Sequence, residues 1–186
     1  AQTWPFHGRS LAAAGMPAEI AILSSGLLAP AGAYGLLALA FPLFPAAFAS
    51  TAPWLLAVVV VGMLLSGLSA CVEVDVRRSL ASWNVAWVSL AFLGVVSGNR
   101  SAATGAVFLF VVQGLLFGDL HYLGALFERR GRAAGIASGG GLMELSPPLG
   151  AGLAVVLLGA MAAPFTAGFP AVLVVLHGVS MRSFGL

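Results

Sequence analysis

The side chains that could carry out chemistry are few, and two of them lie close together in the stretch 103–127. Asp119 and His121 are titratable groups within a long apolar run, where an ionisable side chain is costly and is therefore a functional candidate. A carboxylate and an imidazole on one helix could hold protons or water in a relay. Residues two apart point to different faces of a helix, however, so the two cannot both face one channel. The alternative is that Asp119 pairs with a neighbouring helix or subunit.

Glu19 is a third titratable residue in an apolar region, the stretch 14–45. We expect it to be a buried carboxylate in the first half of a broken helix. Gln113, about a turn and a half before Asp119, adds a neutral amide to the helix that carries the other two. Glu19, Asp119 and His121 are therefore the candidates for a proton relay.

Four charged residues cluster at a boundary between two apolar stretches. They are Glu73, Asp75, Arg77 and Arg78. Opposite charges this close together at a membrane edge indicate mutual neutralisation and anchoring of the helix ends.

No arrangement typical of an active site occurs in the sequence. There is no glycine-rich phosphate loop after a strand, no pair of histidines four residues apart and no nucleophile beside a base. The single cysteine, Cys71, excludes an internal disulfide and a cysteine-based metal cluster. The sequence therefore predicts no catalytic residue, no metal and no cofactor for this chain itself.

The amino-acid composition indicates that the chain is surrounded by lipid and not by water. The 186 residues are 60% hydrophobic and 8% charged, with a mean hydropathy of +1.05, whereas a soluble domain carries roughly a quarter charged residues. So few charges cannot cover a globule in water, and lipid must surround the chain. No basic stripe is present, so we expect membrane lipids and no nucleic acid among the partners.

The apolar stretches predict an all-α fold, a single polytopic membrane domain over 1–186 with about six transmembrane helices. A loop over 1–13 leads into the first helix, and proline at position 30 removes a helical hydrogen bond and breaks that helix near 29–31. The predicted helices are 14–45, broken at Pro30, and then 54–72, 79–97, 103–127, 148–162 and 165–181, with a loop at 131–147. With six spans, all the arginines except Arg100 fall on one side, including Arg182.

Several segments, in this order, resemble those of one known family. They are Gln2-Thr3-Trp4-Pro5, Gly26-Leu27-Leu28, Ala33-Tyr34-Gly35-Leu36-Leu37, Pro42-Leu43-Phe44-Pro45, Asp75-Val76-Arg77-Arg78-Ser79-Leu80-Ala81, the run from Gly105 to Arg129, and Pro164-Phe165-Thr166-Ala167-Gly168-Phe169. Together they look like the antiporter-like membrane subunits of respiratory complex I, closest to NADH dehydrogenase subunit 4, the M type. The resemblance covers only the C-terminal half of that family's helical core.

The resemblance also implies where proton-carrying residues should stand. The family uses lysine or glutamate at helix breaks, and those positions are matched here by Pro30 and Val172. Gln113 stands where the family has histidine, and Arg77 stands where it has lysine. Arginine stays protonated through any physiological cycle, and the other three do not titrate. The resemblance therefore implies that the fold is retained and the proton path is lost, with a dry interior between the breaks.

From this resemblance and its departures we expect a structural or degenerate antiporter-like subunit in the membrane arm of proton-pumping NADH:ubiquinone oxidoreductase, without a complete proton path of its own. One alternative is a working half of a split proton-translocating subunit that uses Glu19, Asp119 and His121. Another is an unrelated small membrane transporter. The expected partners are other membrane-arm subunits of complex I, including a chain that supplies the missing half of the fold.

The chain begins at Ala1, and nothing before Leu11 resembles a signal peptide. We expect either that an upstream segment is removed or that the chain is one piece of a larger unit. Its basic residues are all arginine, which together with abundant Ala, Gly and Val suggests a GC-rich coding sequence. An imported half of a split mitochondrial subunit fits these features, so we expect a multi-pass protein of the mitochondrial inner membrane, with the bacterial plasma membrane as the alternative.

Overall fold

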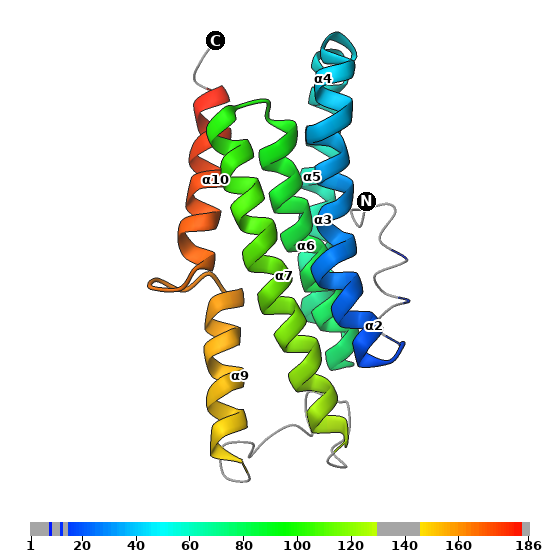
Figure 1. Cartoon of the computed structure of the whole chain (residues 1–186), viewed down its shortest axis with the longest axis vertical. Helices are drawn as coiled ribbons and strands as arrows, with labels where there is room; N and C mark the ends of the chain where they lie inside the picture. Colours follow the sequence, from blue (N-terminus) through cyan, green and yellow to red (C-terminus); the bar gives the residue numbers. More distant parts are fainter. Residues whose placement is uncertain (1–7, 9–11, 13–14, 130–145, 184–186) are drawn as a thin grey trace.

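The apolar stretches of the sequence form helices that run side by side along one long axis (Figure 1). The computed structural model describes residues 8, 12, 15–129 and 146–183, so the predicted loops at 1–13 and 131–147 lie almost wholly outside the described residues. The elements are α2 (Ala18–Leu23), η1 (Ser24–Leu28), α3 (Ala29–Gly35), η2 (Leu36–Ala40), α4 (Phe41–Leu43), α5 (Pro45–Val72), α6 (Val76–Val96), α7 (Arg100–Arg129), α9 (Pro147–Ala160) and α10 (Gly168–Ser183).

Four helical runs in the described residues are long and apolar enough to cross a membrane. They are Glu19–Leu43, Pro45–Val72, Val76–Val96 and Arg100–Leu126, and two shorter apolar helices follow them. The prediction of an all-helical membrane bundle of about six helices is confirmed. The second helix starts at Pro45 instead of residue 54, because Pro45 occupies the first helical position, where a missing N–H costs nothing.

The first helix is interrupted without being unwound. Two π-helical segments, η1 and η2, divide it, and Pro30 stands in the first turn of α3 directly after η1. Leu28 and Ala29 keep helical backbone angles. The predicted break at 29–31 is therefore wrong as a discontinuity: Ala29–Gly35 is regular α-helix, and the irregularity is the π-helical turn Ser24–Leu28 that precedes Pro30.

The two short helices lie one after the other along α7 (Figure 1). A side chain at Gly159, near the end of α9, would meet Leu116, and one at Gly178 of α10 would meet Ala102. The end of α10 is therefore at the end of the bundle where α7 begins. The expectation that Arg182 lies on the side opposite Arg100 is therefore wrong. Arg182 is at the same end of the bundle as Arg100, because α9 and α10 together run along the length of one long helix.

Helix α6 forms the centre of the bundle and α5 its outer edge. In the apolar 18-residue stretch of each helix, 72% of α6 is buried inside the bundle, against 17% of α5. The rings of Trp83 and Trp87 on α6 meet Phe117 of α7 edge to face, at centroid distances of 5.6 and 6.1 Å. This aromatic contact holds the two central helices together and fixes which face of α7 points inward.

Candidate functional site

A fully buried polar contact between helices is made by the amide of Gln113. Gln113 is the middle residue of the span Arg100–Leu126 and is 0% exposed. Its Nε2 donates one hydrogen bond to the backbone carbonyl of Ser25, at 3.0 Å, and another to Oδ1 of Asn84. We call Gln113, Asn84 and the Ser25 carbonyl the Gln113 network. It joins α7, α6 and the interrupted first helix at the middle residue of the α7 span.

The Ser25 carbonyl needs this donor because of the local sequence. In a π-helical turn a carbonyl accepts from the N–H five residues later. Five residues after Ser25 is Pro30, which has no N–H. A backbone carbonyl without a partner in lipid costs free energy, so the Gln113 amide takes the place of the hydrogen that proline lacks. The proline at the break and the amide on α7 therefore act as a pair.

The Gln113 network is electrically neutral. Gln113 and Asn84 carry amides, both are buried, and the Ser25 hydroxyl donates to the Ile22 carbonyl of its own helix at 3.1 Å. Among the described residues, Gln113 Oε1 has no hydrogen-bond partner. The arrangement stabilises a helix irregularity through hydrogen bonds, and no group in it changes charge near neutral pH.

The space beside this network is apolar. A groove of about 510 Å³ lies between the first helix and α7. It is lined by Ile22, Leu23, Gly26, Leu27, Pro30, Tyr34, Leu37, Val107, Phe110, Val111, Gly114 and Leu115. Ordered water needs two to four polar partners, and of these side chains only that of Tyr34 is polar. The walls next to the break therefore favour lipid or apolar side chains over a file of water.

The three relay candidates are placed differently from one another. Glu19 is exposed in the first turn of α2, near one end of the first span, so the expectation of a buried carboxylate there is wrong. His121 is buried, with Nδ1 2.6 Å from the Phe117 carbonyl of its own helix, so Nδ1 carries the hydrogen. Asp119 is exposed on the other side of α7. The bundle therefore separates Asp119 from His121.

The charged boundary residues anchor helix ends. The Asp75 carboxylate accepts from the backbone N–H of Arg77 at 3.0 Å and caps α6. The Arg77 guanidinium donates from Nη1 to the Met16 carbonyl at 3.1 Å, and Ser79 Oγ donates to the Ala70 carbonyl at 2.8 Å. Arg77 thus links the start of α6 to the segment that precedes the first helix.

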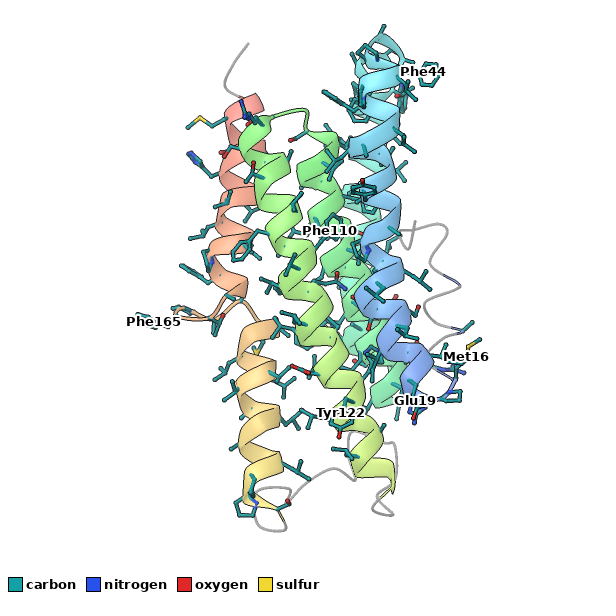
Figure 2. All side chains as sticks on the ribbon, in the orientation of Figure 1. Met16, Glu19, Phe44, Phe110, Tyr122 and Phe165 are labelled. Carbon is teal, nitrogen blue, oxygen red and sulfur yellow. The ribbon has the colours of Figure 1, made fainter. Side chains whose placement is uncertain are left out.

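A second irregular segment lies between α9 and α10 (Figure 2). Its backbone takes positive φ at Ala162 (51°) and Phe165 (70°), and the Phe165 side chain points fully outward. Val172, the position matched to a titrating residue of the family, is half-buried in the α10 helix that follows. No group of three His, Cys, Asp or Glu side chains that could hold a metal occurs in the part of the chain that the structure describes.

Two members of the Gln113 network were missed by the sequence analysis. Asn84 is the only amide in the stretch 79–97, and a lone polar side chain in an apolar helix could have been singled out as a candidate for an interhelical contact. The Ser25 carbonyl follows from counting back five residues from Pro30, but only once the helix is known to be π-helical there. Sequence alone does not show whether the backbone hydrogen bonds span five residues, as in a π-helix, or four, as in an α-helix.

Comparisons with known proteins agree on one family. The family model described as NADH:quinone oxidoreductase/Mrp antiporter, TM, matches residues 1–185. The NADH-quinone oxidoreductase subunit M of Rickettsia conorii is 27% identical over 154 residues, which are 82% of this chain and 31% of that protein. The NADH-ubiquinone oxidoreductase chain 4 of Metridium senile is 30% identical over 100 residues, or 54% of this chain and 20% of that one.

A solved structure gives the same result for the fold. A chain in the respiratory complex I of Thermus thermophilus with bound NADH superposes with a TM-score of 0.89 and 28% identity, over 98% of this chain and 39% of that chain. The chain is thus less than half as long as the relatives it matches.

Proposed function

Because the chain belongs to the NADH:quinone oxidoreductase/Mrp antiporter membrane family, we propose that it is an antiporter-like subunit of the membrane arm of a proton-pumping NADH:quinone oxidoreductase. In this role it packs against other membrane-arm subunits and holds them in place. It carries no complete proton path of its own.

The observation that carries the proposal is the Gln113 network at the middle of the α7 span. A group in a proton relay must spend time both charged and neutral, so its pKa has to lie near ambient pH. The polar groups that meet at the break are two amides and a backbone carbonyl, which do not titrate there. A break closed in this way supports packing and supplies no proton carrier.

The irregular segment between α9 and α10 supports a role inside an assembly. α9 and α10 follow one another along α7, so this segment lies part-way along the bundle (Figure 1). Irregular backbone at membrane depth is tolerated where protein covers it or where it lines a cavity. Phe165 and Met161 are exposed on it. Cover by a neighbouring subunit satisfies that requirement.

Purification of the affinity-tagged chain tests this role directly. We expect the chain, extracted from its native membrane in mild detergent, to elute together with NADH:quinone reductase activity and with the other membrane-arm chains. The physical reason is that membrane helices associate through close packing at small residues and through interhelical polar contacts, and both survive in mild detergent. Peptide mass spectrometry of the eluate and an NADH oxidation assay are the measurements. Elution of the chain alone, with the reductase activity left behind, contradicts the proposal.

A further inference from the structure

Asp119 lies on the outside of the bundle. Asp119 precedes Leu126, the end of its span, by seven residues, which is about 10 Å of helix. An aspartate side chain is too short to reach the membrane surface from there, unlike lysine or arginine. Asp119 is exposed, and it makes no hydrogen bond or ion pair with the residues that the structure describes. A carboxylate facing lipid at this depth is costly and calls for a partner.

The surface around Asp119 suits a helix. Leu115, one turn before Asp119, and Val111, one turn before Leu115, are both exposed on α7 and both line the apolar groove. Tyr122, nearly one turn after Asp119, is exposed as well, and Figure 2 shows it on α7 facing the viewer. We call Val111, Leu115, Asp119 and Tyr122 the α7 stripe. An apolar helix can lie along it and fill the groove beside it.

The described residues of a second copy would offer no basic side chain from the middle of an apolar span. The chain has no lysine, and its eight basic residues are all arginines. Arg77, Arg78 and Arg100 stand at helix starts, and Arg129 ends α7. None of these four arginines lies in the middle of an apolar span.

We propose that the α7 stripe is the docking surface for a transmembrane helix of another membrane-arm chain, and that this helix carries an arginine or lysine that pairs with Asp119. The pair is shielded from water by the apolar residues above and below it, which strengthens the attraction of opposite charges. The stripe selects its partner helix by charge and by depth. This inference rests on the proposed function in one respect, namely that the partner helix belongs to the membrane arm of the NADH:quinone oxidoreductase.

Substitution of Asp119 tests the pairing. We expect Asp119→Leu and Asp119→Asn each to lower the retention of the tagged chain in the detergent-extracted complex at least about tenfold, because the basic group on the partner is left buried without its counter-ion. The matched control is Glu73→Gln, which removes one carboxylate in the turn between α5 and α6, outside the apolar spans; its retention should be unchanged. If Asp119 simply faced lipid, Asp119→Leu would leave retention unchanged or raise it, and that result contradicts the inference.

Cross-linking identifies the partner without disturbing Asp119. In a Cys71→Ser background, Leu115→Cys is labelled in native membranes with a photoreactive thiol reagent, and Leu68→Cys on α5 is the control. The two positions are matched in exposure, at 67% and 66%. We expect Leu115→Cys to link to a transmembrane segment that has an arginine or lysine within one helical turn of the linked residue, and Leu68→Cys not to link to that segment. Links only to lipid, to this same chain or to a segment without a basic residue contradict the inference.

The identity of the linked chain separates this inference from the proposed function. A basic transmembrane segment in an NADH:quinone oxidoreductase subunit supports both. A basic segment in a membrane protein outside that enzyme supports the docking surface and contradicts the proposed function. Co-purification with the enzyme combined with lipid-only links supports the proposed function and contradicts the docking surface.

Discussion

Replacing Gln113 with leucine is expected to lower the free energy of unfolding by about 2–4 kcal/mol, because two buried polar groups lose their partner at once. The Ser25 carbonyl then has no donor, since Pro30 offers no N–H, and Asn84 Oδ1 loses the same amide. Leucine fills a similar volume, so loss of packing contributes little. The measurement is the fraction of folded chain during SDS titration of mixed detergent micelles.

A double-mutant cycle separates the hydrogen bonds from general damage. Asn84→Leu combined with Gln113→Leu removes both amides, so the pair should cost clearly less than the sum of the two single substitutions. Thr104→Val is the control, since Thr104 is an exposed residue in the first turn of α7 that bonds only to the Arg100 carbonyl of its own helix. Additive losses would show that Gln113 and Asn84 act independently and that the network has no special role.

Replacing Gly178 with alanine is expected to destabilise the chain by about 2–3 kcal/mol, because α10 and α7 touch through their backbones at this point. A Cβ at Gly178 would lie 2.6 Å from Ala102 Cα and 2.7 Å from Ala102 Cβ. Backbone cannot move aside as a flexible side chain can, so the helices must separate. Aggregation temperature of the extracted chain is the measurement.

Gly152→Ala on α9 is the matched control. A Cβ at Gly152 meets no atom within 4 Å, and alanine favours a helix more than glycine does. Its aggregation temperature should stay the same or rise slightly. An equal loss at both glycines would mean that the close approach of α10 to α7 is not what Gly178 provides.

Much of the fold could be read from the sequence, because lipid allows few alternatives. Backbone groups in a membrane must be paired within the segment, so each long apolar run had to form a helix, and Val76–Val96 and Arg100–Leu126 match the stretches 79–97 and 103–127 closely. The length of the helix that starts at Pro45 was underestimated, because a proline at a helix start reads in sequence like a boundary.

The arrangement of the short helices could not be read in the same way. Hydropathy shows that 148–162 and 165–181 are apolar, but it does not show whether two helices lie side by side or one after the other. Contacts of Gly159 with Leu116 and of Gly178 with Ala102 decide this. The side of the membrane assigned to Arg182 depended on that choice, and for this reason it was wrong.

Only part of the site was predicted from the sequence: Gln113 was singled out, whereas Asn84, the Ser25 carbonyl and the contacts between them were not. Pro30, Gln113, Asp119 and His121 were all singled out by their types in apolar surroundings. The pairing of Gln113 with the Ser25 carbonyl depends on a π-helical turn, which leaves no clear signal in sequence. Helical periodicity did indicate that Asp119 and His121 face different ways, and the structure places one exposed and the other buried.

The most direct test of the account is the number of protons translocated per electron in purified complex reconstituted into liposomes, with Glu19, Asp119 and His121 replaced by Gln, Asn and Gln. The measurement is made on the fraction that stays assembled and is normalised to NADH oxidation, so that weaker docking at Asp119 does not enter. If this chain carries no complete proton path, the ratio equals that of the unmodified complex. A lower ratio in an otherwise intact complex contradicts the account and favours a working half-channel.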